Sequence, residues 1–236
     1  MKLKDTVALV TGAGRGIGKA IAITLATEGS TAVLVARTKS ELESVRSEIE
    51  GRGGKAIALP ADITKPEQVH LVFDEVSKQF GRLDILVNNA GIGRFAPVKE
   101  LSLSDFDAMW NVNMRGLFLC TQQAVKMMEA RKSGVIVNIS SLAGKNAFVN
   151  GAGYAATKWA LMGFAKCLML EVREQNIRVV TVCPGSVDTT FSHPQDPSKA
   201  EKLIQPQDVA DIVLAAITIP ARSMVSEIDI RPTNPK

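Results

Sequence analysis

Short apolar runs alternate along this chain with longer stretches of helical periodicity. Most of the apolar runs are continuous, which is typical of strands buried on both faces. We expect strands at residues 6–11, 31–36, 55–60, 83–88, 134–140, 177–183 and 227–230. We expect helices at residues 16–28, 39–50, 66–80, 103–131, 152–175 and 206–218. This alternation predicts an α/β fold, a doubly wound parallel sheet of about seven strands with helices on both faces.

Composition narrows the class of protein. No linker or change of composition divides the 236 residues, so we expect one domain over residues 1–236. The net charge of +4 comes from lysines and arginines dispersed along the chain, so nucleic acid is not an expected partner. The chain enters a predicted strand almost at its start, and no apolar run reaches the ~20 residues of a membrane span. We therefore expect a cytoplasmic protein with no membrane segment.

Cysteine and histidine usage excludes further site types. Cys120, Cys167 and Cys183 all lie in apolar runs, which predicts small buried hydrophobes in a reducing compartment rather than disulfides. The chain has only two histidines and no Cys/His cluster, so we expect no metal site.

Residues 11–18, TGAGRGIG, join the first predicted strand to the first predicted helix. A helix N-terminus there offers free amides to a pyrophosphate, and glycines allow the ligand a close approach. The spacing excludes a Walker loop, which needs glycine at Ala13, and the G-x-G-x-x-G fingerprint, which needs glycine at Ile17. T-G-x-x-x-G-x-G remains, with a purely structural turn as the alternative. The candidate cofactor residues are Gly12, Gly14, Arg15, Gly16, Ile17 and Gly18.

The end of the second predicted strand reads Ala36-Arg37-Thr38 and contains no acid. In dinucleotide-binding folds, an acid there holds the ribose 2′-hydroxyl of NAD, whereas an arginine accommodates the 2′-phosphate of NADP. Arg37 and Arg15 can approach one phosphate from two sides. The alternative is that both are surface arginines with no role in binding the cofactor. NADP(H) is the predicted cofactor, with Thr38 beside it. Asp62 follows the third strand, either as an acceptor for the adenine amino group or as part of the next helix start.

Tyr154, the only tyrosine, is followed one helical turn later by Lys158. An ammonium beside a phenol lowers a phenol pKa that is about 10 in water. Such a phenol can exchange a proton with a carbonyl or alcohol oxygen, although a surface pair has the same spacing. Ser141 ends a predicted buried strand, at the sheet edge where ligands bind, and can orient the same oxygen. A serine nucleophile is the rival interpretation, but the chain has no G-x-S-x-G elbow.

In these motifs the chain resembles the short-chain dehydrogenase/reductase family over nearly all of its length. The motifs that carry the resemblance are TGxxxGxG at 11–18, NNAG at 88–91, NVN at 111–113, Ser141, Tyr154-x-x-x-Lys158 and PG at 184–185. The resemblance implies a Rossmann-type NADP-binding domain. It also implies a catalytic tetrad of Asn113, Ser141, Tyr154 and Lys158.

The resemblance assigns a role to each member of this tetrad. Tyr154 would be the acid/base, Ser141 would hold the carbonyl, and Lys158 would bind the nicotinamide ribose. Asn113 would anchor a proton-relay water; without the family pattern, a helix kink or a solvent-facing position explains this polar residue equally well. Asn89 to Gly91 would line the adenine ribose side, and the residues after Pro184-Gly185 would contact the nicotinamide carboxamide. The further implied cofactor contacts are Ile63, Asn89, Ala90, Gly91, Pro184, Gly185, Val187 and Thr189, with Tyr154 and Lys158 among them.

The segment after residues 184–185 is short, and the C-terminal VSEIDIRPTNPK has no double glycine. We expect a short substrate lid at about 188–205 and an open pocket. Its candidate side chains are Phe95, Phe148 and Phe191, for which core or lid packing is the alternative. His193 lies on the lid, either against the substrate or in solvent.

Together these features predict an NADP(H)-dependent carbonyl reductase or alcohol dehydrogenase, resembling a 3-oxoacyl (ACP/CoA) reductase or a general carbonyl reductase. The short tail resembles members that act on 3-hydroxy acids, serine or sepiapterin-like compounds, so the substrate stays open. The alternative from another class is a non-catalytic NADPH-sensing regulator, against which the complete tetrad argues. In the family, the helices equivalent to 103–131 and 152–175 pair across an interface, so we expect a homodimer or homotetramer.

Overall fold

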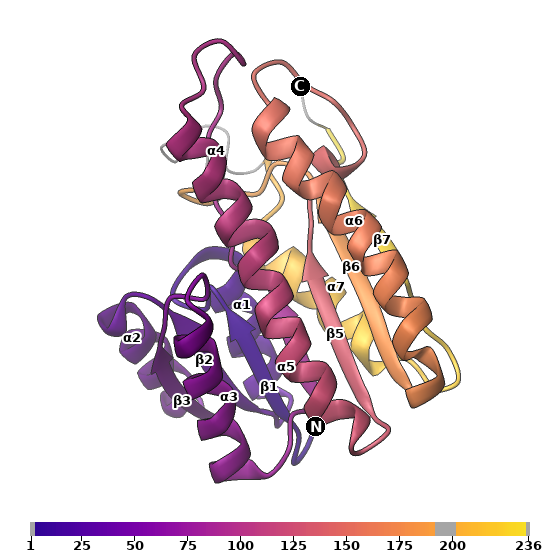
Figure 1. Cartoon of the computed structure of the whole chain (residues 1–236). Helices are drawn as coiled ribbons and strands as arrows, with labels where there is room; N and C mark the ends of the chain where they lie inside the picture. Colours follow the sequence, from indigo (N-terminus) through magenta and orange to yellow (C-terminus); the bar gives the residue numbers. More distant parts are fainter. Residues whose placement is uncertain (1–2, 192–201, 235–236) are drawn as a thin grey trace.

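The computed structural model describes residues 3–191 and 202–234. Its centre is one seven-stranded parallel sheet in the order β3-β2-β1-β4-β5-β6-β7 (Figure 1). The strands are Val7–Thr11 (β1), Thr31–Ala36 (β2), Lys55–Pro60 (β3), Ile85–Asn88 (β4), Gly134–Ile139 (β5), Ile177–Pro184 (β6) and Glu227–Ile230 (β7). All seven predicted strands form, with ends that differ by a residue or two. The predicted fold class is confirmed.

Helices cover both faces of the sheet (Figure 1). They are Gly16–Thr27 (α1), Lys39–Gly51 (α2), Pro66–Phe80 (α3), Leu103–Trp110 (α4), Leu117–Glu129 (α5), Ala152–Val172 (α6) and Pro206–Thr218 (α7). One apolar core joins the sheet to α1, α2 and α7, and a second joins its other face to α3, α5 and α6. The chain runs outward from β1 to β3, then returns to β4 and continues to β7. Ligands of such sheets bind where the order reverses, at the carboxyl ends of the strands.

The predicted helix over 103–131 is divided in the structure. A π-helical segment, Asn111–Gly116, separates α4 from α5. Asn113 lies in this segment and is 2% exposed, so the solvent-facing alternative is wrong. A buried amide needs partners, and the local change in helix geometry occurs where this side chain turns inward to reach them. The predicted helix over 152–175 likewise ends in a short 3₁₀ turn, Arg173–Gln175.

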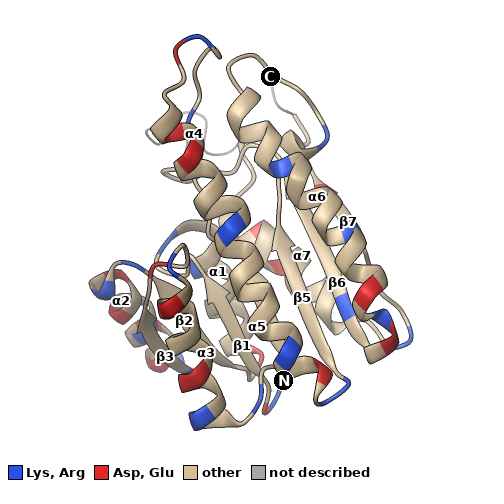
Figure 2. Ribbon diagram, in the orientation of Figure 1, with Lys and Arg blue, Asp and Glu red and all other residues tan. Residues whose placement is uncertain are grey.

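Charged residues of both signs are interspersed over α2 and α3 (Figure 2). On α2, Arg46 lies 2.9 Å from Glu43, and Glu48 lies 2.8 Å from Lys19 of α1. The two opposite charges of each pair neutralise one another locally. No helix among residues 3–191 and 202–234 is long and apolar enough to cross a membrane. Cys167 is exposed on the outer side of α6, which corrects the prediction that all three cysteines are buried.

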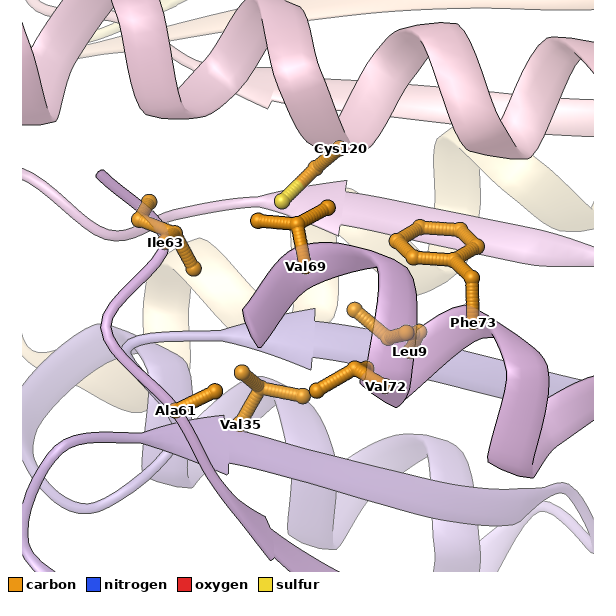
Figure 3. A pocket seen from close by; sticks show the side chains of 8 residues that line it. All are labelled: Leu9, Val35, Ala61, Ile63, Val69, Val72, Phe73 and Cys120. Carbon is orange, nitrogen blue, oxygen red and sulfur yellow. The ribbon is translucent and has the colours of Figure 1, made fainter. Parts of the chain in front are cut away.

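The core beneath β1 and β2 contains a small apolar space that leaves no room for a water molecule (Figure 3). Its lining side chains are Leu9, Val35, Ala61, Ile63, Val69, Val72, Phe73 and Cys120. Burial raises the pKa of the Cys120 thiol to about 12, so this thiol acts as a packing group. The space is part of a dry core.

Candidate active site

A cleft of about 1310 Å³ opens at the carboxyl ends of the strands. Loops that follow β1 to β6 line it, and Arg231 and Pro232 after β7 complete it. The predicted site residues in its lining are Gly12, Gly14, Arg15, Gly16, Ile17, Arg37, Thr38, Asp62, Ile63, Asn89, Ala90, Gly91, Ser141, Tyr154, Lys158, Pro184, Gly185, Val187 and Thr189. The lining does not include the predicted residues Gly18 and Asn113. The fold therefore brings segments far apart in sequence to one cleft.

The glycine loop needs glycine for two physical reasons. Gly12 and Gly16 have φ angles of +66° and +54°, a region that side chains disfavour. Gly18 is buried against the loop itself, where a Cβ would collide with the carbonyl oxygen of Gly12. Arg15 is the N-cap of α1, and no side chain caps the helix through a hydrogen bond. The first amides of α1 are thus left for a ligand in the cleft.

Asn89, directly after the neighbouring strand β4, holds this loop in place. Its Nδ2 donates to the carbonyl oxygen of Thr11 at 2.9 Å and, at 3.3 Å, to that of Gly12. The Thr11 hydroxyl accepts from the backbone amides of Asn89 and Ala90 at 3.0 and 3.1 Å. The two loops at the switch point of the sheet are therefore held as one unit.

The two predicted arginines, Arg15 and Arg37, line the same cleft. Sequence analysis missed their neighbour Glu41, in the first turn of α2, which also lines it. The Oε1 atom of Glu41 lies 3.9 Å from Nη1 of Arg15. The signal in the sequence is an acid in the first turn of the predicted helix, four residues after Arg37.

Asp62 closes a tight turn at the start of the α3 connection. Its Oδ1 accepts from the amide of Thr64 at 3.0 Å and from the hydroxyl of Thr64 at 2.8 Å. The N-cap of α3 is Lys65, so Asp62 lies just before the helix start. Asp62 lines the cleft in this position, and the adenine contact stays a prediction.

Tyr154 and Lys158 lie one turn apart near the start of α6 and are 7% and 5% exposed. The Nζ of Lys158 donates to the carbonyl oxygen of Ile139 at 2.9 Å and lies 5.8 Å from the centre of the Tyr154 ring. Ser141 follows β5, and its hydroxyl accepts from the amide of Ala143 at 3.1 Å. The pair is therefore built into the cleft wall, and the alternative of a surface pair is wrong.

The electrostatics of this pair differ from the sequence-based prediction. Burial raises the pKa of Tyr154 to about 12, although a hydrogen bond with Ser141 lowers it in part. Burial also lowers the pKa of Lys158 to about 8. The expected depression of the phenol pKa by Lys158 is thus wrong in direction, because removal of both groups from water is the larger effect.

Asn113 lies behind the cleft and ties three segments together. Its Oδ1 accepts from the amide of Ile92 at 2.9 Å, and its Nδ2 donates to the Ile92 carbonyl oxygen at 2.9 Å and to Thr157 Oγ1 at 3.0 Å. The Thr157 hydroxyl in turn donates to the backbone oxygen of Tyr154 at 2.8 Å. Asn113 therefore fixes both the loop after β4 and the helix that carries Tyr154.

The loop after β6 crosses back toward the glycine loop. Gly185 donates its amide to Ile230 at 2.8 Å, and Val187 forms a parallel bridge with Ile204. The methyl group of Thr189 lies 3.3 Å from the position that a Cβ would take on Gly16. Most of the predicted lid at 188–205, including His193, lies outside the described residues.

Two phenylalanines contact the Tyr154 ring, and a third contacts one of these two. Phe95, Phe148 and Phe191 are 37%, 46% and 42% exposed, and all three line the cleft. Packing in the core is therefore not their arrangement, and contact with substrate and packing under the lid both stay predictions.

The lining fits a dinucleotide with a phosphorylated ribose. The uncapped N-terminus of α1 and the glycines provide a cradle that side chains would fill, and two arginines lie at its edge. The hydroxyl of Ser140 lines the cleft, is buried, and has no hydrogen-bond partner among the described residues. No group of three His, Cys, Asp or Glu side chains within residues 3–191 and 202–234 could hold a metal ion.

Residues 6–200 match the short chain dehydrogenase family. The chain belongs to this family of oxidoreductases. Sepiapterin reductase from Chlorobaculum tepidum is 34% identical over 235 residues, which are 97% of this chain and 96% of that protein.

Solved structures agree with this family. A metagenomic short-chain oxidoreductase in complex with NADP is 38% identical and superposes with a TM-score of 0.89 over 99% of this chain and all of its own. A 7α-hydroxysteroid dehydrogenase complexed with NADH and 7-oxo glycochenodeoxycholic acid is 31% identical, with a TM-score of 0.91 over 98% of this chain and 94% of its own.

Proposed function

We propose that this protein is an NADP(H)-dependent oxidoreductase that interconverts a carbonyl and a secondary alcohol, as a general carbonyl reductase or a 3-oxoacyl reductase. The observation that carries the proposal is that Ser141, Tyr154 and Lys158 line one cleft together with the glycine loop. A proton donor, a hydroxyl that can orient the same oxygen, and a cation are thereby gathered beside a dinucleotide cradle.

When bound, NADP(H) supplies the hydride chemistry. The Tyr154 hydroxyl donates a proton to the carbonyl oxygen of the substrate during reduction, and accepts it back during oxidation. The Ser141 hydroxyl holds that oxygen in place. The Lys158 ammonium stabilises the negative charge that develops on the Tyr154 oxygen. Asn113 positions Tyr154 through Thr157.

The pKa values bear on the direction of proton transfer. Burial raises the pKa of Tyr154 to about 12, so the phenol is protonated at neutral pH and ready to act as an acid. The acid form is the one required for carbonyl reduction. Alcohol oxidation needs the phenolate, so it gains from alkaline pH.

Arg15 and Arg37 support NADP(H) over NAD(H), because guanidinium groups suit a dianionic phosphate and the end of β2 has no acid. The metagenomic relative binds NADP, whereas the hydroxysteroid dehydrogenase binds NADH. The shared fold alone therefore does not choose between the two cofactors, and the arginines carry the proposal.

A sepiapterin-type reduction is a second candidate. It is supported by the similarity to the Chlorobaculum tepidum enzyme along nearly the whole chain. Both candidates require the same proton donor and differ only in the compound that the cleft accepts.

A spectrophotometric assay of NADPH oxidation tests the proposal, with a panel of diketones, 3-keto esters, 3-oxoacyl thioesters and a pterin. The matched variant is Tyr154→Phe, which keeps the ring and removes the hydroxyl. We expect turnover to fall by about 100- to 10,000-fold, the range for loss of a general acid, while fluorescence titration shows that NADPH still binds. Full activity of Tyr154→Phe, or no reduction of any compound by the unaltered protein, contradicts the proposal.

The proposal includes a homodimer or homotetramer. Phe118 of α5, and Trp159 and Leu170 of α6, are 45%, 54% and 60% exposed, and a second copy packed on these helices would cover them. Sedimentation velocity measures the expected assembly, and a monomer at micromolar concentration contradicts it.

A further inference from the structure

We propose that Phe95, Phe148 and Phe191, here called the aromatic wall, select a neutral carbonyl compound whose carbonyl carries a flat apolar or aromatic group. This inference rests on the proposed function and names the substrate class that the site takes. Its basis is the arrangement of three rings around the proton donor.

The wall meets Tyr154 on two sides. The Phe95 ring centre is 5.4 Å from that of Tyr154, at an interplanar angle of 74°. The Phe191 ring centre is 5.9 Å from Tyr154, and Phe148 extends the wall from Phe95, again at 5.9 Å. These are separations at which aromatic rings attract one another. Any substrate whose oxygen reaches the Tyr154 hydroxyl therefore lies beside aromatic surface.

Two glycines make room for the rings. A Cβ on Gly93 would lie 2.8 Å from Phe95 and 2.9 Å from Phe191, so these two rings pack directly over a bare backbone. A Cβ on Gly151 would collide with the ring of Phe148. The rings are thus seated against the backbone in the cleft.

A backbone hydrogen bond joins the two segments that carry the first two rings. The amide of Ala96 donates to the carbonyl oxygen of Asn150 at 3.1 Å. The amide of Phe191 donates to the Thr189 hydroxyl at 3.3 Å. The wall is held by its loops before any substrate enters, which reduces the entropy lost on binding.

Two arginines of the cleft lining, Arg94 and Arg231, are each paired with an acid, and the buried Lys158 donates to the Ile139 carbonyl oxygen. Arg94 lies 3.3 Å from Asp105 and also donates to the carbonyl oxygen of Gly93 at 3.1 Å. Arg231 lies 3.4 Å from Asp229. A substrate carboxylate would have to compete with these acids, and its desolvation beside three phenyl rings is costly. This argues for a neutral substrate and against 3-hydroxy acids or serine.

The exposure of the rings is the reason to assign them to a ligand. Side chains of this size stabilise a fold when they are buried, yet each of the three is more than a third exposed and lines the cleft. An aryl or flat apolar group would cover this surface while its carbonyl faces Tyr154 and Ser141.

Two pairs of keto compounds separate ring from charge in the NADPH assay. Ethyl benzoylformate and ethyl pyruvate differ by phenyl against methyl, and ethyl benzoylformate and benzoylformate differ by ester against carboxylate. We expect kcat/KM to be at least about 10-fold higher for ethyl benzoylformate than for either partner. Phe95→Leu and Phe148→Leu should each lower it for ethyl benzoylformate by about 3- to 10-fold, and change it for ethyl pyruvate by less than about 2-fold.

The matched control is Phe80→Leu, at the end of α3 and outside the cleft lining, which should change neither ratio. Equal losses on both esters in the wall variants, or a preference for benzoylformate, would overturn the inference while leaving the proposed function intact.

A binding measurement keeps the inference testable if no compound is reduced. Saturation-transfer NMR with acetophenone, in the absence of cofactor, should show transfer to the ring protons in the unaltered protein and in Phe80→Leu. It should fall by about 3-fold or more in Phe95→Leu and Phe148→Leu. Undiminished transfer in both wall variants refutes the aromatic wall, whatever the assay of turnover gives.

Discussion

The two ends of the cleft present different chemical groups to a ligand. The cofactor end, formed by the loops after β1, β2 and β3, offers mainly backbone groups, glycines at positive φ and uncapped amides, with exposed side-chain charges such as Arg15 beside them. The substrate end, formed by loops after β4, β5 and β6, is a matter of side chains: a buried Tyr154 and Lys158 behind aromatic rings. The first end binds through geometry that glycine permits, and the second reacts through groups whose properties depend on burial.

The largest expected effect comes from a substitution that disrupts NADPH binding at the cofactor end and leaves the substrate end intact. Gly18→Ala places a Cβ against the Gly12 carbonyl oxygen, so the loop must shift. We expect NADPH affinity to fall by at least about 100-fold, since a shift of about 1 Å in a positioning group can cost about that much. The crowding should also lower the free energy of unfolding by about 1–3 kcal/mol. Fluorescence titration and thermal unfolding measure the two effects.

The control is Gly51→Ala, where a Cβ meets nothing within 4 Å. It should leave NADPH binding unchanged. Acetophenone binding should survive in Gly18→Ala, and its loss would show that the two ends of the cleft are not separable.

A smaller effect concerns the choice of cofactor. Arg37→Asp removes a cation from the end of β2 and adds an anion that can hold a ribose hydroxyl. We expect the NADPH-to-NADH preference to fall by about 10- to 100-fold, the worth of a hydrogen bond to a charged group. Steady-state kinetics with both cofactors measure this ratio. The control is Arg131→Asp, at a residue outside the cleft lining, which should leave the ratio unaltered. An unchanged ratio in Arg37→Asp would show that Arg37 does not determine the choice of cofactor.

The substrate end should show a pH dependence of about tenfold. Burial lowers the pKa of Lys158 to about 8, so its ammonium is present below that pH and lost above it. Carbonyl reduction, which uses this charge, should therefore decline by about tenfold between roughly pH 7 and pH 9. Alcohol oxidation should rise over the same range because it needs the Tyr154 phenolate. Rates measured in both directions test this dependence on pH. Lys166→Met, which removes another lysine of α6, is the control and should show the same pH dependence as the unaltered protein. A reduction rate that is flat to pH 10 contradicts the assignment.

The smallest expected effect again concerns the cofactor end. Glu41→Gln removes a carboxylate that faces Arg15 in the cleft. We expect NADPH to bind about 2- to 5-fold more tightly, the range for an exposed ion pair, and NADH affinity to stay constant. Calorimetric titration distinguishes the two cofactors. Glu43→Gln, which lies on α2 outside the cleft lining, is the control, and equal tightening for NADH would mean that Glu41 acts on the shared pyrophosphate.

Sequence predicted the two ends unequally. The seven strands, the glycine loop and the Tyr154–Lys158 pair follow from spacing, because periodicity and turn geometry are local properties of the chain. The direction of the Tyr154 pKa shift does not, since it depends on burial by segments distant in sequence. Glu41 was missed for a related reason: an acid on a charged helix looks ordinary until the fold places it beside Arg15. The ring contacts of Phe95 likewise arise only when the loops after β4 and β5 meet the start of α6.

The π-helical segment at residues 111–116 has a consequence for tolerance of mutation. A π-helical turn holds an extra residue relative to the α-helix around it, and each α-helical residue accounts for about 100° of rotation. A π-helical residue turns through less than this, so loss of one residue here would restore a regular helix with α4 and α5 close to their present orientation. It would remove the bulge from which the Asn113 amide reaches Ile92 and Thr157. The length of this stretch therefore matters for the site as well as Asn113 itself, and we expect a deletion here to be more damaging than most replacements.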